Sequence, residues 1–381
     1  MIDGLAAHYT RFRVSERLLL TGHSHQAWPD VAFDGVSESF EDSAELVDTK
    51  WGRAFAKADR VRRGYRSLIG DPEAEIALGS STHELVLRFL SALDLRGRLI
   101  TTDGEFHTLR RQLGRLAEAG VEVVGVAARP VDTLAERLAT AIDSETAAVL
   151  VSAVLFEDAR IVPGLAELAG TCAERSVELL LDAYHALGTV PFAAPRSAWV
   201  VGGGYKYLQL GEGNCFLRIP EHAWDWRPVI TGWYAEFSRL ERDAGRPARI
   251  PYGPRAEAFA GSTYDPASHY RAARVLDFFI EQGLSPQVLR ECYQSQLAVL
   301  AEAFDRIDSS SITRDRDTPL EHFGGFLALR TPRAAELQAA LFERGVFTDH
   351  RGEFLRFGPA PYLSDEQLER AMGELQAVLA A

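Results

Sequence analysis

The chain has 381 residues, 46% of them hydrophobic, which is enough for a large folded core and unlike a disordered or fibrous chain. Its formal charge of −13 argues against nucleic-acid or anionic-membrane partners, because both need clustered positive charge. It has no apolar run of about 18 residues and no signal-peptide core at its start. Its three cysteines form no CxxC pair. We therefore expect a cytoplasmic globular protein of two or three domains.

The first part of the chain begins with a short mixed segment and then becomes helical. Residues 1–20 are predicted to form an arm that joins the small domain, with a short strand at 18–20 before the loop TGHSHQAWPD. Apolar residues recur at helical spacing over 31–68, which predicts one long helix or two shorter ones. The stretch IALGSSTHELVLRFLSAL is typical of strand, turn and helix, with Ser81 as N-cap and Glu84 at N3.

Strands and helices then alternate as far as residue 219. Helices are predicted at 107–119, 131–142 and 165–175, and strands at 99–102, 121–126, 147–156, 177–183, 198–201 and 214–219. This alternation predicts right-handed crossovers and a mostly parallel sheet flanked by helices. In such sheets ligands bind at the carboxyl ends of the strands.

The pattern changes after residue 220. Residues 221–266 are rich in Trp, Arg, Pro and Gly, which predicts loop with short elements. The remainder mixes strands at 325–329 and 354–357 with helices at 267–282, 285–307, 333–344 and after Ser364. We therefore predict a large α/β domain over 21–265 and a smaller α+β domain over 266–381.

Charged and hydroxylated side chains follow several of the predicted strands. Asp182 ends one strand, Lys206 follows the run WVVGGG, and Ser81 and Thr82 open a helix after a third strand. A helix N-terminus favours phosphate, a lysine amine can form a Schiff base, and a buried carboxylate can pair with a pyridinium nitrogen. Together these groups predict a site for pyridoxal phosphate (PLP), with Phe106 as the residue that stacks on the ring.

Each of these features also has a simpler interpretation when it is taken alone. Ser81 with Thr82 forms a capping box, Asp182 suits a turn, and a lysine after glycines is usually solvated. The glycines of GGGYKYLQLGEG lack the GxGxxG spacing of a dinucleotide site. His23 and His25 have no acidic or cysteine partner nearby in the sequence, so no metal site is predicted. The joint placement at strand ends is what favours PLP.

The segments DAYHALG, GGGYKYL and GEGNCFL resemble the PLP-dependent enzymes of fold type I, in the aminotransferase class V superfamily. Within that superfamily the chain is most similar to kynureninases, on the Asp-x-x-His and Tyr-Lys-Tyr elements and on GVFTDHRGEFLRFGPAPYLS. The segments TGWYAEF and FAGST resemble those that reach the cofactor of the partner subunit. The resemblance implies an α/β fold of PLP transferase fold type I and a homodimer with shared active sites.

The resemblance also implies residue roles. Lys206 is the Schiff-base lysine and proton shuttle, Asp182 pairs with the pyridine nitrogen, and Tyr205 donates to the phosphate and can serve as an acid. The other implied cofactor contacts are Ser81 and Thr82 at the phosphate, Phe106 stacked on the ring, His185 at the ring's phenolic oxygen or at Asp182, and Trp233 and Thr263 from the second subunit.

Substrate contacts are implied at two further places. Arg356 would grip the substrate α-carboxylate as a bidentate fork, for which the simpler interpretation is a surface salt bridge. His23 or His25 would contact the substrate side chain at the mouth of the site, for which the simpler interpretation is loop capping. The chain departs from kynureninases in this histidine loop and at residues 153–157.

The favoured function is a PLP-dependent enzyme that hydrolytically cleaves the Cβ–Cγ bond of an α-amino acid, as kynureninases do. An aminotransferase of the same superfamily needs the same lysine, aspartate and arginine, so it stays an alternative. A catalytically silent binding protein on this scaffold is a third reading. A cysteine desulfurase is disfavoured because it needs a thiolate near the C-terminal loop, and no cysteine follows Cys292.

Overall fold

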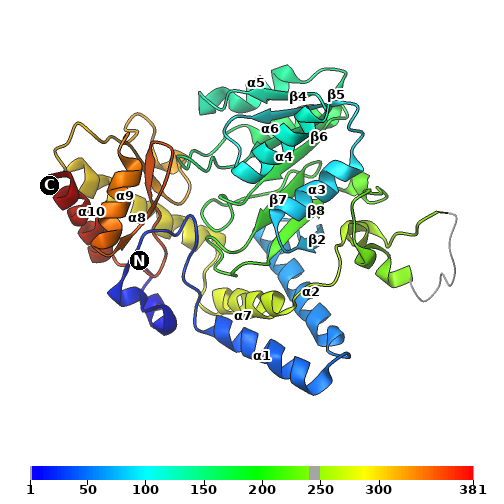
Figure 1. Ribbon diagram of the computed structural model, residues 1–381, viewed down its shortest axis with the longest axis horizontal. Helices are drawn as coiled ribbons and strands as arrows, with labels where there is room; N and C mark the ends of the chain where they lie inside the picture. The colour runs from blue at the N-terminus through cyan, green and yellow to red at the C-terminus, as the bar shows by residue number, and fades with distance from the viewer. Residues whose placement is uncertain (1, 240–248, 381) are drawn as a thin grey trace.

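The computed structural model describes residues 2–239 and 249–380, in which a large part and a smaller part lie side by side (Figure 1). The α-helices are α1 (Val31–Leu46), α2 (Trp51–Leu68), α3 (Thr82–Ala92), α4 (His107–Glu118), α5 (Leu134–Ala141), α6 (Leu165–Glu174), α7 (Ala267–Glu281), α8 (Pro286–Asp305), α9 (Ala334–Glu343) and α10 (Asp365–Ala380). The strands are β1 (Leu18–Leu19), β2 (Glu75–Gly79), β3 (Arg98–Thr102), β4 (Val123–Val126), β5 (Thr146–Ser152), β6 (Glu178–Asp182), β7 (Trp199–Gly203), β8 (Cys215–Ile219), β9 (Leu327–Arg330), β10 (Val346–Phe347), β11 (Asp349–Arg351) and β12 (Phe354–Phe357).

The large part is built on a seven-stranded sheet in the order β2-β8-β7-β6-β5-β3-β4. All neighbours from β7 to β4 pair in parallel, whereas β8 runs antiparallel to both β7 and β2. The prediction of a mostly parallel sheet flanked by helices is therefore confirmed. One consequence is that the carboxyl ends of β2, β3, β5, β6 and β7 meet at the same edge.

The central strands are buried because both faces of the sheet are covered by helices (Figure 1). Alternate residues of β5 divide between two apolar clusters: Leu150 packs with the α3 and α4 residues on one face, and Val151 faces the cluster that includes α5 and α6. This burial on both faces explains why β5, β6 and β7 are near-continuous apolar runs. β5 ends at Ser152, four residues earlier than predicted, because the chain turns back so that Val154 bridges Ile161.

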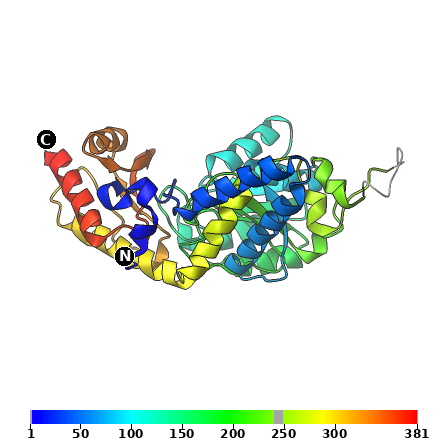
Figure 2. The same cartoon turned by 90° about the horizontal axis from the view of Figure 1, so that it is seen from below.

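Residues 31–68 form two helices with a break after Leu46, one of the two alternatives that the periodicity predicted. α7 packs against both of them, and the view from below shows the three side by side (Figure 2). The contact between α1 and α7 is close: a β-carbon on Gly35 would lie 2.7 Å from the carbonyl oxygen of Tyr270. The first helix after residue 265 thus lies against α1 and α2, and the predicted domain division at that residue stays a prediction.

The smaller part holds the three-stranded antiparallel sheet β11-β12-β9, with α8, α9 and α10 around it. The N-terminal segment is tied to this part, because β1 pairs in parallel with β10 and the Gln367 side chain donates to the carbonyls of Val14 and Arg17.

Within 221–266, short 3-10 helices form at 221–223, 233–239 and 255–259, while residues 240–248 lie outside the described residues. None of the described helices is long and apolar enough to cross a bilayer.

α10 begins with a complete capping box. The Ser364 hydroxyl accepts a hydrogen bond from the Gln367 backbone N–H at 3.2 Å, and the Gln367 side-chain oxygen accepts one from the Ser364 N–H at 3.0 Å. At α3 only half of the predicted box forms: Ser81 accepts from the backbone N–H of Glu84, but the Glu84 side chain bonds to Ser80 and Arg88 instead.

We predict that Ser364→Ala lowers the free energy of unfolding by about 1 kcal/mol, because one helix N–H loses its acceptor. Urea denaturation would measure this change as a lower midpoint. Ser37→Ala removes the same atom from the interior of α1 and is the matched control, with a change within about 0.5 kcal/mol. Equal midpoint shifts for the two variants would contradict the prediction.

Candidate active site

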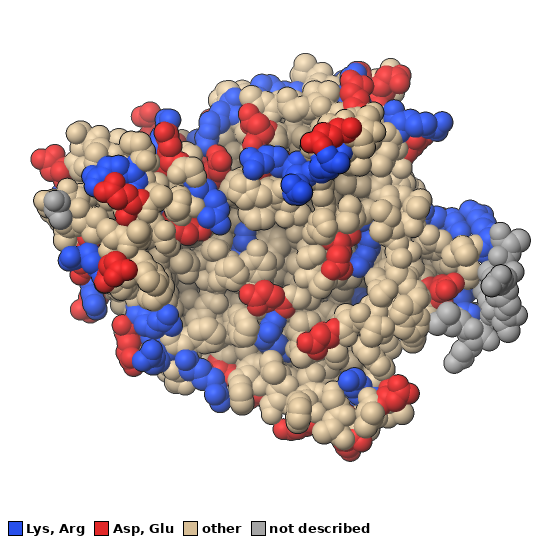
Figure 3. Space-filling model, in the orientation of Figure 1, with Lys and Arg blue, Asp and Glu red and all other residues tan. Residues whose placement is uncertain are grey.

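A cavity of about 190 Å³ lies at the carboxyl edge of the sheet. The space-filling view shows this face of the molecule hollowed between the large and the small part (Figure 3). Seven of the residues predicted for the site line this one cavity: Ser81, Thr82, Phe106, Asp182, His185, Tyr205 and Lys206. They come from four separate segments of the chain, which follow β2, β3, β6 and β7 and which the parallel strands bring to one edge.

Lys206 is placed by the turn that follows β7. The glycines permit close packing there: a β-carbon on Gly203 would meet the Tyr184 ring hydroxyl at 2.5 Å, and one on Gly204 would meet Leu210 at 2.6 Å. The side chain is buried, and its Nζ lies 2.7 Å from Nε2 of His185. Aromatic rings surround the amine, with the Tyr184 ring centroid at 4.8 Å and that of Phe106 at 5.3 Å.

Burial shifts the protonation of the two charged groups toward their neutral forms. It lowers the pKa of Lys206 well below its usual value, against the opposing charge of Asp182. Burial likewise raises the pKa of Asp182. The Tyr184 backbone N–H, which donates to its carboxylate at 2.8 Å, and the charge of Lys206 both oppose this rise. The lysine can therefore act as a nucleophile and base near neutral pH.

His185 is held as a neutral imidazole. Burial lowers its pKa well below the usual value, and the charge of Lys206 adds to this effect. Since Nε2 lies against the lysine amine, it accepts, and Nδ1 carries the proton and faces the Tyr207 hydroxyl at 3.5 Å. Lys206 and Tyr207, rather than Asp182, are thus the polar partners of His185.

The N-terminus of α3 provides the anion-favouring end of the cavity. Ser81 is the N-cap, and Thr82 is the first helical residue, so the first N–H groups of the helix lie at the cavity wall. Phe106, the residue before α4, lines the same cavity with Phe156, and the two rings meet edge to face with centroids 5.4 Å apart. The arrangement offers an anion site, an aromatic wall and an amine in one space.

Glu105 is a buried carboxyl group that the sequence reasoning missed. Its oxygens accept from the Thr102 hydroxyl at 2.8 Å, the Ser152 hydroxyl at 2.6 Å and the Ser152 N–H at 3.1 Å. Burial raises its pKa to about 7, and the charge of Asp182 contributes in the same direction. Its position one residue before Phe106 in DGEFHT was the available signal, but nothing local distinguishes it from an exposed turn residue.

Arg356 is fully engaged within the protein. Its Nε and one terminal nitrogen donate to the two carboxylate oxygens of Asp349 at 2.9 and 2.6 Å, and the other terminal nitrogen donates to the carbonyl of Phe156. The same carboxylate is 2.7 Å from Nε2 of His23. Arg356, which was predicted to bind a substrate carboxylate, thus binds the carboxylate of Asp349 instead. The sequence patterns did not predict this pairing.

The remaining predicted residues lie around this centre. His23 is completely buried behind Asp349, whereas His25 is largely exposed and stacks on Tyr205 with ring centroids 4.8 Å apart. Trp233 and Thr263 lie outside the cavity, on the surface of the same chain, where the indole N–H donates to the threonine hydroxyl at 3.2 Å. Among the described residues, no group of three or more His, Cys, Asp or Glu side chains is placed to hold a metal ion.

No known protein-family profile matches the chain. The chain is 24% identical over 350 residues, 89% of each chain, to the uncharacterised aminotransferase YcbU of Bacillus subtilis strain 168. Among solved structures it superposes with a TM-score of 0.82 on a mutant of C-DES that has glycine linked covalently to its PLP cofactor, at 14% identity over 97% of this chain and 98% of that one. With the apo cysteine desulfurase of Thermococcus onnurineus the TM-score is 0.80, at 16% identity over 96% and 95% of the two chains. The chain has the fold of the PLP-dependent enzymes of fold type I.

We predict that Glu105→Gln flattens the dependence of stability on pH. A carboxyl group whose pKa rises from 4.5 to about 7 on folding stabilises the protein below pH 4.5, and this contribution is lost as the pH rises to 7. Relative to Glu105→Gln, the wild type should therefore lose roughly 3 kcal/mol between pH 4.5 and 8. Urea unfolding across this range measures the difference, with the exposed Glu366→Gln as control. Parallel stability curves for wild type and Glu105→Gln would show that folding leaves the pKa of Glu105 unchanged.

Proposed function

We propose that the protein is a PLP-dependent enzyme that acts on an α-amino acid through Lys206. The observation that carries this proposal is the placement of a buried lysine amine and a buried aspartate in one cavity that begins at a helix N-terminus. Each group matches one part of PLP: the amine its aldehyde, Asp182 its pyridine nitrogen, and Ser81 with Thr82 its phosphate. The fold shared with a PLP-linked structure supports the same cofactor.

When bound, PLP would supply an acceptor for the electrons released as a bond to Cα breaks. The residues around it would position and move protons. Lys206, with its lowered pKa, would hold the cofactor covalently and then take the proton from Cα. Neutral His185, in contact with Nζ, would orient that amine, and Phe106 would close one side of the cavity to water.

Two reactions fit these groups. Hydrolytic Cβ–Cγ cleavage is favoured by the likeness of residues 345–364 to kynureninases, with Tyr205 as the acid. Amino transfer to a keto acid is favoured by the relative in Bacillus subtilis, which is described as an aminotransferase. Both use the same lysine and aspartate, so the reaction must be decided by its products.

Sulfur transfer through a protein thiol does not suit this chain, although several solved structures with this fold are cysteine desulfurases. All three cysteines are buried. Burial raises the pKa of Cys172 and of Cys215 to about 12, which keeps both as thiols. Cys292 lies within α8, and burial raises its pKa as well.

We also propose that the enzyme is a homodimer with shared active sites. Large apolar side chains are exposed on α1, where Phe40 is 76% exposed, and on the segment that includes Ile230 and Trp233. The contact between Trp233 and Thr263 lies on the surface, where these residues could reach a second subunit. Sedimentation at micromolar concentration would test the dimer.

We expect PLP to be attached at a single lysine. The chain contains only three lysines, Lys50, Lys57 and Lys206, and of these only Lys206 is buried in the cavity. Purified protein with added PLP should show a visible absorption band, and borohydride reduction followed by peptide mass spectrometry should place the cofactor on Lys206. Lys206→Ala should abolish the band, and Lys50→Ala should retain it. A wild-type protein that shows no band would instead indicate a silent binding protein.

The reaction itself can be tested with the PLP-loaded protein and two assays. Release of anthranilate and alanine from kynurenine would establish hydrolytic cleavage. Keto-acid-dependent formation of a new amino acid would establish amino transfer. Lys206→Ala should eliminate either activity, by at least about 10³-fold, because no other amine lies in the cavity.

A further inference from the structure

Each nitrogen of the Arg356 guanidinium already donates a hydrogen bond within the protein. Asp349 occupies Nε and one terminal nitrogen in the bidentate arrangement with which arginine binds carboxylates, and the Phe156 carbonyl occupies the other. Arg356 is 3% exposed, and Phe156 also lines the lysine cavity. A buried arginine of this kind requires an anion, and a ligand carboxylate can take the bidentate position on the Nε side only by replacing Asp349.

His23 holds Asp349 from the other side. Burial lowers the pKa of His23 to about 4, with the charge of Arg356 contributing, so the imidazole is neutral. Its Nδ1 has no partner, and Nε2 therefore carries the proton and donates to Asp349. The ring packs closely against Gly358, where a β-carbon would lie 2.2 Å from Nδ1. One oxygen of Asp349 thus keeps its donor whether or not Arg356 is present.

Arg351 is the cation that can pair with Asp349 when a ligand carboxylate occupies Arg356. It lies two residues after Asp349 on β11, so both side chains leave the strand on the same side. Its terminal nitrogen is already 3.7 Å from the second oxygen of Asp349, and its hydrogen bond goes to the neighbouring backbone carbonyl of His350. Its side chain is 39% exposed and therefore has room to move.

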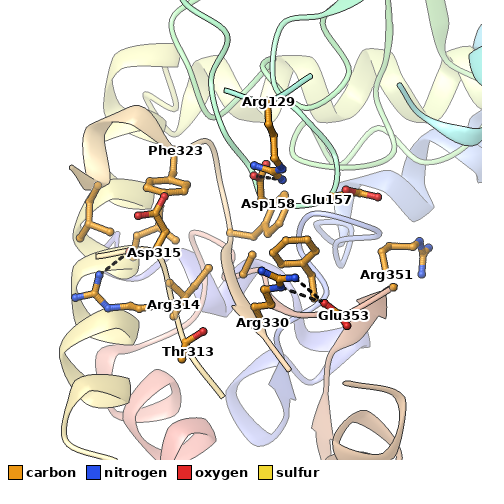
Figure 4. Close-up of a pocket in the computed structure, with 17 residues that line it drawn as sticks. Arg129, Glu157, Asp158, Thr313, Arg314, Asp315, Phe323, Arg330, Arg351 and Glu353 are labelled. Atoms are coloured by element: carbon orange, nitrogen blue, oxygen red, sulfur yellow. Dashed lines mark hydrogen bonds and ion pairs between the residues drawn. The ribbon is translucent and has the colours of Figure 1, made fainter. Parts of the chain in front are cut away.

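The surroundings of Arg351 support this role. In the neighbouring cavity of about 590 Å³, Arg330 is paired with Glu353 and Arg129 with Asp158, whereas Arg351 stands apart at one edge (Figure 4). Among the arginines drawn there, Arg351 is the one without a dashed contact to another labelled residue. Its charge is therefore available to a carboxylate that rotates away from Arg356.

We propose that Asp349 is an internal carboxylate that competes with the substrate for Arg356, and that Arg351 receives it when the substrate α-carboxylate binds. This proposal rests on the proposed function for its substrate, an α-amino acid. Every charge keeps a partner in the exchange: Arg356 passes from one carboxylate to another, and Asp349 passes from one arginine to another while His23 retains it. An amine without a carboxylate cannot drive the exchange, so the pair selects for amino acids.

The experiment compares glycine with methylamine, which differ by the carboxylate alone. Each is titrated into the PLP-loaded protein, and the change in cofactor absorption gives its affinity. Asp349→Asn removes the competing charge and keeps the shape, so glycine should bind roughly tenfold more tightly while methylamine is unchanged. Glu353→Gln removes the same charge from the same hairpin and is the control, with glycine affinity unchanged. Unchanged or weaker glycine binding by a folded Asp349→Asn protein would overturn the proposal.

Arg351→Gln supplies a second test, at a partly exposed position. Displaced Asp349 would then lack its new partner, so glycine should bind roughly twofold to fivefold more weakly. In the Asp349→Asn background the same change should have no effect. A weakening of equal size in both backgrounds would mean that Arg351 binds the substrate directly, and no weakening in either would overturn the exchange.

Failure of the proposed function can be told apart from failure of this inference. In cofactor-free protein, acetate should raise the melting temperature of Asp349→Asn more than that of the wild type, because the carboxylate binds Arg356 without PLP. Protein that takes up no PLP but shows this acetate effect would refute the proposed function and leave the exchange supported. Protein that binds PLP but shows neither the acetate nor the glycine effect would refute the exchange alone.

Discussion

The structure of the candidate site depends on one constraint: charged groups at the carboxyl edge of the sheet are buried, and a buried charge needs a partner or must become neutral. Lys206 and Asp182 meet this constraint partly by attraction and partly by shifting their pKa values toward the neutral forms. His185 becomes neutral beside the amine, and Glu105 shares its oxygens among hydroxyl and amide donors. The resulting site is poised to change protonation near neutral pH.

The sheet makes this concentration of polar groups possible. Parallel pairing brings the ends of β2, β3, β5, β6 and β7 to one edge, and apolar clusters on both faces fix the strands rigidly. Loops at that edge can therefore hold polar side chains in defined positions without adding to the core. β8, which runs in the opposite direction, begins at the same edge and brings Cys215 to the cavity floor.

A second set of charges joins the small part of the molecule to this edge. Arg356 and Asp349 lie on neighbouring strands of the small sheet, where they face one another in register, and Arg356 also bonds to the carbonyl of Phe156 in the large part. His23 reaches the same carboxylate from the N-terminal loop. The backbone of this loop is hydrogen-bonded to Gly358. Three distant segments are thereby tied together by one buried ionic network, whose strength depends on every member being satisfied.

Much of the fold was readable from local patterns in the sequence. The apolar runs and helix periodicities predicted the sheet, its mostly parallel character and nearly all of the helices, because burial on two faces imposes those patterns directly. The cluster of Lys206, Asp182, His185, Phe106 and the Ser81 turn was also predictable, since each follows a strand and parallel strands end at one edge. What the tertiary structure alone decided was the pairing of charges: Asp349 in the fork of Arg356, His23 behind it, and Glu105 under the strand ends. These contacts join residues up to several hundred positions apart, and no local periodicity records which buried ions will meet.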